Sequence, residues 1–139
     1  PQTKSHPWDD MLVRAQHALK QGTLKGILWH QGESDSNEES ASLYADRLEA
    51  LVRRFRTKLE APNVPFIAGQ MGQFPERPWN EHRQLVDRET QRLPSKTRNC
   101  AFVHSDGLSH KGDETHFNAN SYRELGKRYF AAFQRLTKD

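Results

Sequence analysis

Two groups of polar residues have the types and spacing needed for nucleophilic or acid–base chemistry. The first is Gln31-Gly32-Glu33-Ser34-Asp35, a dense run of amide, acid and hydroxyl side chains after a short apolar segment. The second is Asp113-Glu114-Thr115-His116, where an acid and an imidazole three residues apart can meet on one turn. A carboxylate bonded to one imidazole nitrogen fixes the tautomer and leaves the other nitrogen free to take a proton. The spacing therefore predicts the Asp–His half of a catalytic triad.

Each group also has a purely structural interpretation. Ser34, Asp35, Ser36 and Asn37 are all residue types that cap helices, and either Asp113 or His116 could cap the helix that follows. An Asp-x-x-His spacing also arises often by chance. The functional interpretation gains weight because the two groups follow neighbouring strands.

Hydrophobic periodicity predicts helices and strands that alternate along the chain. Apolar residues spaced by three and four predict helices over 11–19, 44–59, 82–93 and 122–136, and short apolar runs predict strands at 26–30, 64–69 and 100–104. We expect Pro94 to stop the third helix. Ser121 with Glu124 is spaced as a capping box for the last helix, and Asn118 or Asn120 is an equally good cap.

This alternation predicts an α/β three-layer sandwich whose parallel strands are joined by right-handed crossovers. In such sheets ligands bind beyond the carboxyl ends of the strands. The informative loops are therefore 31–36, 70–80 and 105–117, which contain both polar groups.

Composition indicates one domain over residues 1–139. With 139 residues, 34% hydrophobic and 28% charged, the chain can bury a real but thin core, and a partner could cover some apolar surface. The lone Cys100 excludes an internal disulfide framework and multi-cysteine metal or redox motifs, and we expect it to be a buried small hydrophobe.

Charge and hydropathy argue against two classes of partner. The net charge of +3 is modest and lysines and arginines are mixed with acids, which disfavours nucleic-acid binding. The densest basic run, Arg53, Arg54, Arg56 and Lys58, is expected on the outer face of a helix. No stretch reaches the ~20 apolar residues of a membrane span, and residues 1–20 lack the apolar run of a secretory signal.

The two polar groups resemble motifs of a known family. Trp29-His30-Gln31-Gly32-Glu33-Ser34 resembles the Trp-x-Gln-Gly-Glu-Ser block of SGNH hydrolases in the sialate O-acetylesterase and carbohydrate esterase family 6 (acetylxylan esterase-like) group. Gly112 to Phe117, followed by Ser121 to Tyr129, resembles the final Asp-x-x-His block and helix of that group. The resemblance spans most of residues 6–135 and implies an SGNH, flavodoxin-like hydrolase fold.

The resemblance also implies roles for single residues in hydrolysing acetyl esters on sugars. His116 would be the general base, Asp113 its orienting acid and the Gln31 amide an oxyanion donor, while Gly32 and Glu33 would shape the site. A serine oxygen would attack the acetyl carbonyl, and water activated by His116 would release acetate. The resemblance implies no metal and no cofactor, and it favours a secreted or periplasmic location.

One part of the family pattern is missing from the sequence. The nucleophile of the family lies in a Gly-Gln-Ser block near the start of the domain, and neither that block nor the second, glycine-bearing oxyanion block occurs here. We therefore expect the C-terminal portion of an SGNH domain, incomplete at its N-terminus. A companion polypeptide or fragment would carry the nucleophilic serine.

Three alternatives remain open at this point. Ser34 imitates a nucleophile elbow but lacks the second glycine, and we expect Ser5, Ser105 and Ser109 on the surface. A metal hydrolase could use His30, His104, His110 or His116 with Asp35, Asp106 or Asp113, although none has a zinc-helix spacing. A non-catalytic sugar-binding module could stack a sugar on Trp79, Phe74 or His82, whereas Trp8 and Trp29 are expected in the core.

Overall fold

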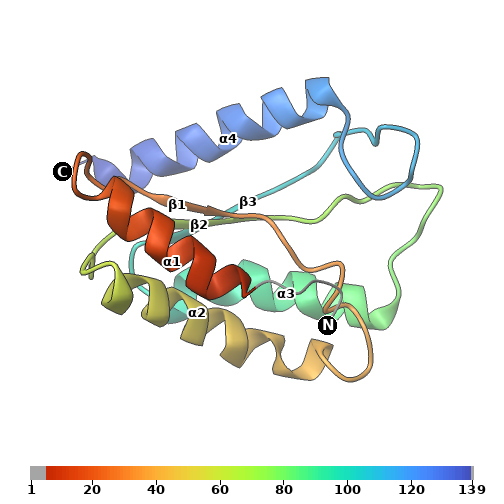
Figure 1. Ribbon diagram of the computed structural model, residues 1–139. Helices are drawn as coiled ribbons and strands as arrows, with labels where there is room; N and C mark the ends of the chain where they lie inside the picture. Colours follow the sequence, from red (N-terminus) through yellow and green to blue (C-terminus); the bar gives the residue numbers. More distant parts are fainter. Residues whose placement is uncertain (1–5, 139) are drawn as a thin grey trace.

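The chain folds into a parallel sheet with helices on both faces (Figure 1). The structure, a computed structural model, describes residues 6–138. Helices α1 (Pro7–Ala18), α2 (Tyr44–Lys58) and α3 (Glu81–Lys96) lie on one face, and α4 (Ala119–Thr137) covers the other. A short 3-10 helix, Ala41–Leu43, leads into α2. The layered α/β architecture predicted from the sequence is confirmed.

The sheet has three strands in the order β1 (Ile27–Trp29), β2 (Phe66–Gly69) and β3 (Cys100–Val103). Both pairings are parallel, with Ile27 opposite Phe66 and Phe66 opposite Cys100. All three strands therefore end at the same edge of the sheet. The loops that follow them, 30–37, 70–80 and 104–117, leave from that edge as expected. The two polar groups do not follow neighbouring strands, however, because β2 lies between β1 and β3.

The central strand divides the core into two layers. Because successive side chains of a strand point to opposite faces, Phe66 and Ala68 pack toward α2 and α3, while Ile67 packs toward α4. The first layer also contains Val52, Val86 and Leu93, and the second contains Val103, Leu125, Tyr129 and Ala132. Cys100 is buried in the first layer, which confirms its interpretation as a small hydrophobe.

Helix α4 is fixed to the sheet by one phenol. The Tyr129 hydroxyl donates to the Trp29 carbonyl at 2.7 Å. Gly69 makes room for that hydroxyl, because a Cβ at this position would collide with it. The contact joins the last helix to the first strand, 100 residues apart in the chain.

Two helix boundaries differ from the sequence-based prediction. Pro94 does not stop α3, which continues to Lys96, because a proline in the last turn removes a single helical bond and the end is otherwise satisfied. Thr97 donates its backbone N–H to the Leu93 carbonyl, and the Ser95 hydroxyl donates to the Arg92 carbonyl. The cap of α4 is Asn118, whose side chain accepts from the Ser121 N–H, and not the Ser121–Glu124 box.

Three side chains lie in environments other than those expected. Ser105 is buried, and its hydroxyl donates to the Met71 carbonyl at 2.8 Å. Arg56 is half-buried because its guanidinium donates to the carbonyls of Val64 and Asn99 and so ties α2 to the segments entering β2 and β3. Trp8 is half-buried instead of lying in the core, since it packs on the outside of α2.

One edge of the sheet is open in this part of the chain. Within residues 6–138, β1 pairs with β2 and has no strand on its other side. Leu28 on this edge is 62% exposed, and Phe130 of α4 is 59% exposed.

No helix within the described range is long and apolar enough to cross a bilayer.

Candidate active site

The Asp113–His116 pair is assembled in the loop between β3 and α4. Asp113 Oδ2 lies 2.6 Å from His116 Nδ1, and Asp113 Oδ1 accepts the backbone N–H groups of Thr115 and His116. The backbone bond from His116, the bond to its imidazole and that from Thr115 hold the pKa of the Asp113 carboxyl well below its usual range. The pair predicted from the Asp-x-x-His spacing is therefore formed.

This geometry sets the tautomer of His116. Because Asp113 is ionised and has no proton to donate, it accepts a hydrogen bond from the Nδ1–H of His116, and in this neutral tautomer Nε2 keeps a free lone pair. The His116 side chain is 60% exposed, and its Nε2 hydrogen-bonds to no residue of the described range. The imidazole can therefore accept a proton from a group that approaches from outside this part of the chain.

Several short-range bonds hold the loop that carries the pair. His110 Nδ1 accepts the N–H groups of Gly112 and Glu114, and Lys111 donates its N–H to the His116 carbonyl at 2.9 Å. At the two ends of the loop, Leu108 and Phe117 are buried in the layer under α4. The loop is thus built from residues close in sequence and anchored by two apolar side chains.

Gln31 lies elsewhere. Its Nε2 donates to Asp35 Oδ2 at 2.6 Å, and its backbone carbonyl accepts from the Tyr44 hydroxyl at 3.1 Å. The side chain lines a cavity of about 310 Å³ together with Trp29 and residues of α2, on the face of the sheet opposite α4. The structure therefore does not bring the Gln31 amide into contact with His116 or Asp113, because Asp35 holds it on the α2 side.

Gly32 and Glu33 occupy the turn that leaves β1. Gly32 has φ +156°, and a Cβ there would lie 2.8 Å from Met71 Sδ and 3.0 Å from Val86 Cγ1. A side chain here would force Met71 or Val86 to shift, so Gly32 lets the turn pack closely onto α3. Glu33 is half-buried and faces a polar cavity of about 120 Å³ that Arg77 and Arg83 also line.

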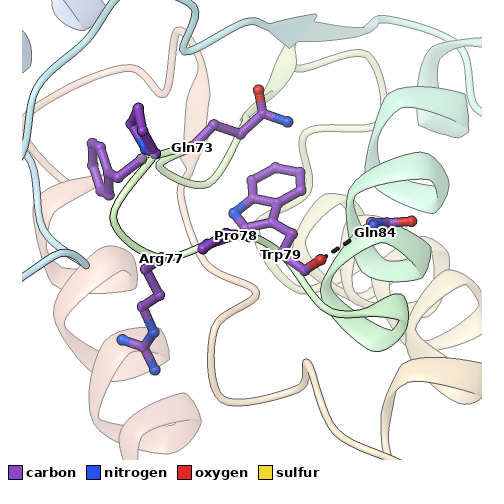
Figure 2. Close-up of a pocket in the computed structure, with 7 residues that line it drawn as sticks. Gln73, Arg77, Pro78, Trp79 and Gln84 are labelled. Carbon is purple, nitrogen blue, oxygen red and sulfur yellow. Dashed lines mark hydrogen bonds between the residues drawn. The ribbon is translucent and has the colours of Figure 1, made fainter.

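A larger cleft lies beside this cavity, along the loop between β2 and α3 (Figure 2). Its volume is about 530 Å³, and its lining includes the rings of Phe74 and Trp79. The Trp79 indole N–H donates to the Gly72 carbonyl at 2.9 Å, and Gln84 donates to the Trp79 carbonyl, as the dashed line in Figure 2 shows. Trp79 is half-buried at this cleft, whereas Phe74 is buried and its ring packs against His110 and Phe117. His82 is not part of the lining.

The alternative serines and histidines are spread over several environments. Ser34 and Ser109 are exposed and Ser105 is buried, while Ser5 lies outside the described residues. Burial lowers the pKa of His30, whose ring packs against Phe117. Across residues 6–138, no three histidine, cysteine or acidic side chains are grouped as ligands for a metal ion.

Sequence reasoning missed two sets of polar residues at this end of the sheet. Arg83 lies on the buried face of α3 with Val86, and its position in that helical pattern was the available signal. Gln70 directly follows β2 and connects Ser105 to Asp87: its Oε1 accepts from the Ser105 N–H, and its Nε2 donates to the carboxylate. This second set joins the end of β2, the loop after β3 and helix α3, which are far apart in the sequence, so no local sequence pattern predicts it.

Comparisons with known proteins agree with this architecture. A family model described as carbohydrate esterase, sialic acid-specific acetylesterase, matches residues 2–135. A probable carbohydrate esterase of Arabidopsis thaliana is 29% identical over 126 residues, a match that covers 88% of this chain and 45% of the plant protein. The chain therefore spans about half the length of that relative.

Solved structures show the same fold. The crystal structure of the Arabidopsis protein superposes with a TM-score of 0.82 at 26% identity, covering 95% of this chain and 53% of the other. A carbohydrate acetylesterase from Xanthomonas citri superposes with a TM-score of 0.67 at 22% identity, covering 86% of this chain and 27% of the other. The fold is that of SGNH-type hydrolases.

Proposed function

Because the chain belongs to the family of carbohydrate esterases described as sialic acid-specific acetylesterases, we propose that the protein containing it hydrolyses acetyl esters on sugars. The observation that carries the proposal is the Asp113–His116 pair, with an ionised acid on Nδ1 and a free Nε2. This is the arrangement in which an imidazole acts as a general base toward a hydroxyl nucleophile.

In the proposed reaction, Nε2 of His116 takes the proton of a serine hydroxyl as its oxygen attacks the acetyl carbonyl. The tetrahedral intermediate collapses to an acyl-enzyme, and His116 returns the proton to the departing sugar oxygen. His116 then activates a water molecule, whose attack releases acetate and regenerates the serine. Asp113 keeps the imidazole in one orientation and stabilises it while it is protonated.

The nucleophilic serine comes, in this proposal, from a segment outside residues 1–139. Two observations support such a segment: the match covers 45% of the plant relative, and β1 has an open edge within the described range. Beside that edge, Leu28 and the α4 residues Gly126 and Phe130 line an apolar hollow of about 260 Å³. Leu28 also shares a second hollow with Tyr122, which is 48% exposed.

We propose that this surface, defined by Leu28, Tyr122, Gly126 and Phe130, binds a β-strand and a following helix of the serine-bearing segment. An added strand would satisfy the backbone groups of β1, and a helix would cover the apolar side chains of α4. A one-residue register shift would turn the apolar side chains of the added strand away from that helix, so the register of the added strand is constrained.

Gln31 as oxyanion donor requires one rearrangement. Its amide must leave Asp35, to which it now donates at 2.6 Å, and turn toward the acetyl carbonyl. Binding of the serine-bearing segment next to β1 would act directly on the strand that leads into Gln31, and this is where the proposal places the change.

A second candidate function is a carbohydrate-binding module without catalysis. The Phe74 and Trp79 cleft favours it, because it is lined entirely by residues of this chain, whereas the nucleophile is not among them (Figure 2). The half-buried Trp79 indole, bordered by amide and guanidinium groups, suits a sugar ring with its hydroxyls.

Acetate release by the complete protein separates the two candidates. We expect purified protein to release acetate from O-acetylated sugars and to be labelled by a fluorophosphonate on a serine that intact mass and peptide mapping place outside residues 1–139. A His116→Ala variant should lose both activity and labelling. Binding of sugars without acetate release, at any pH from 5 to 9, would reject the esterase and support the binding module.

A chelator control tests the metal hydrolase reading of the sequence. The proposed serine mechanism predicts that activity is unchanged after treatment with EDTA and dialysis. Loss of activity that returns when zinc is added would contradict it.

A further inference from the structure

His110 lies in the loop between β3 and α4 that also carries the Asp113–His116 pair. Its Nδ1 accepts the backbone N–H of Gly112 at 3.0 Å and that of Glu114 at 3.2 Å. These two residues are the chain neighbours of Asp113. One imidazole nitrogen therefore holds the backbone on both sides of the carboxylate that bonds to His116.

Packing does little to order this part of the loop. Gly112, Asp113 and Glu114 are exposed, and within the described range no heavy atom beyond its chain neighbours lies within 4 Å of a Cβ placed at Gly112. Glu114 has φ +54°, a left-handed conformation that costs free energy in a residue other than glycine and persists where other contacts compensate for it. The bond from the Glu114 N–H to His110 is such a contact.

The imidazole of His110 is itself fixed by the loop that follows β2. Its ring packs edge-on against Phe74, with the ring centroids 5.0 Å apart, and Phe74 is buried in the layer under α4. The His110 side chain is only 22% exposed, so few other positions are open to the ring. The same loop reaches Thr115, whose hydroxyl oxygen accepts from Arg77 at 2.6 Å. His110 thus connects the apolar core to the exposed segment around Asp113.

The bonds at Nδ1 set the tautomer of His110. A ring nitrogen that accepts N–H groups carries no hydrogen, so the neutral imidazole has its hydrogen on Nε2. The Glu76 Oε2 atom lies 3.7 Å from that nitrogen. His116 has the opposite arrangement, since its Nδ1 carries the hydrogen and its Nε2 is free. The imidazoles of His110 and His116 are therefore expected in different tautomers, one to hold the backbone and the other to accept a proton.

We propose that His110 is a positioning residue for the Asp113–His116 pair, because its Nδ1 lone pair holds Asp113 where the carboxylate can orient the imidazole of His116. The inference rests on the proposed esterase function and adds to it a residue that acts on the base without touching the substrate. A general base works only within hydrogen-bond distance of the proton that it takes. An error of about 1 Å in its position can cost roughly 100-fold in rate.

Nuclear magnetic resonance on the complete protein tests this geometry without any reaction. At about pH 8, two-bond proton–nitrogen correlation spectra report which nitrogen of each neutral imidazole carries the hydrogen. We expect the hydrogen on Nε2 in His110 and on Nδ1 in His116, with the signals assigned by their loss in His110→Asn and His116→Gln. A hydrogen on Nδ1 of His110 would overturn the inference.

Two variants of nearly the same shape isolate the accepting atom. His110→Leu and His110→Asn both remove the ring from Phe74 and both branch at Cγ, but the second keeps an accepting oxygen near the former position of Nδ1. We expect His110→Leu to lower kcat on acetylated sugars roughly 10- to 100-fold and to leave KM within about threefold of wild type, because a displaced base affects the transition state and not substrate binding. His110→Asn should recover most of that loss.

The tautomer of His116 is the readout that a merely structural effect would leave unchanged. In His110→Asn its hydrogen should stay on Nδ1, whereas His110→Leu should give a mixture of both tautomers, since the Asp113 carboxylate is no longer held in place. His104→Leu, at an exposed position of the same loop, is the control. This variant should leave both kcat and the His116 signal as in wild type.

The outcomes separate this inference from the proposed function. Equal losses of turnover in the two His110 variants would assign the effect to the lost contact with Phe74 and overturn the inference, as would a loss confined to KM. A wild type that releases no acetate would reject the proposed function alone, because the tautomers of His110 and His116 are measured without substrate. If His110→Leu does not fold, the wild-type tautomers decide the question.

Discussion

The loops 104–117 and 30–37 leave the same edge of the sheet, but their polar side chains differ in what holds them. In the first loop, the acid and base are bonded to each other and the reactive nitrogen of His116 is free. In the second loop, the Gln31 amide donates to Asp35 and the turn packs onto α3 through Gly32. The first loop therefore leaves an imidazole nitrogen unbonded within the described range, whereas the polar groups of the second loop are bonded to each other.

The difference follows from the range of the contacts. Asp113 and His116 lie three residues apart, so the local backbone suffices to join them. Gln31 instead follows the edge strand β1, and its amide donates to the carboxylate of Asp35, four residues further along the chain. In the proposed reaction this amide turns toward the acetyl carbonyl only when the serine-bearing segment binds beside β1.

The largest effect in this comparison is expected from the Asp113–His116 pair, which the proposed mechanism makes the general base and its orienting acid. His116→Ala should lower kcat on acetylated sugars by about 10⁴-fold or more, and Asp113→Asn by a similar order, because the imidazole loses its tautomer and its charge partner. Steady-state acetate release measures both.

These two variants should leave folding nearly unchanged, since both side chains are at least partly exposed. Urea unfolding is the control. Turnover within tenfold of wild type in His116→Ala would remove the pair from the mechanism.

The second effect concerns Gln31. If the Gln31 amide is an oxyanion donor, Gln31→Ala should lower kcat by roughly 10²- to 10³-fold. Asp35→Ala, which removes the acceptor and leaves the amide, is the matched control and should lose far less. Full turnover in Gln31→Ala would assign the amide a structural role. Only the 104–117 loop would then contribute to the proposed reaction.

Substituting one glycine in each loop by alanine tests how tightly the two loops are packed. Gly32→Ala places a methyl group against Met71 and Val86 and should lower the free energy of unfolding by about 1–3 kcal/mol. Gly112→Ala, with φ +113° and open space around it, should lower it by about 1 kcal/mol through backbone strain alone. Equal losses would show that the 30–37 turn is not packed more tightly than the 104–117 loop.

The smallest effect is on stability as a function of pH. Burial lowers the pKa of His30 below its ordinary value of 6.5. Between these two pKa values, His30 is protonated in the unfolded chain and neutral in the folded chain. The free energy of unfolding should therefore fall as pH drops from 6.5 toward the depressed pKa. His30→Gln should flatten this slope.

Asp113→Asn provides the contrast for that measurement. The Asp113 pKa is depressed from an ordinary value of 3.8, so its contribution to stability is present above that value and is lost in stronger acid. The variant should leave the slope between pH 5 and 6.5 as in wild type. A slope that survives His30→Gln would locate the titrating group elsewhere.

Much of the fold could be predicted from the sequence because its signals are local. Strand β2 is a short, fully buried apolar run, and α4 carries apolar residues at helical spacing. The error at Pro94 arose because a proline rule for helix interiors was applied in a last turn, where the cost is one bond.

The candidate site was predictable to the same extent. The Asp-x-x-His spacing gave the pair, whereas the buried set of Gln70, Asp87 and Ser105 is joined by tertiary contacts across strands β2 and β3 and helix α3. Arg83 was hidden for another reason: a charged residue on a buried helix face needs the coordinates to reveal whether a counter-charge reaches it. Here Glu33 lines the same cavity as Arg83, but no acidic group of the described range forms an ion pair with it.

The Tyr129 phenol has a mechanical consequence. Its hydroxyl donates to the Trp29 carbonyl and packs directly against the backbone of Gly69, which has no side chain. Movement of α4 along the sheet would therefore break that hydrogen bond or bring the phenol into steric overlap with β2. Axial displacement of the helix is thereby coupled to β1. A displacement of β1 at the open edge of the sheet would therefore also displace α4, the helix that begins three residues after His116.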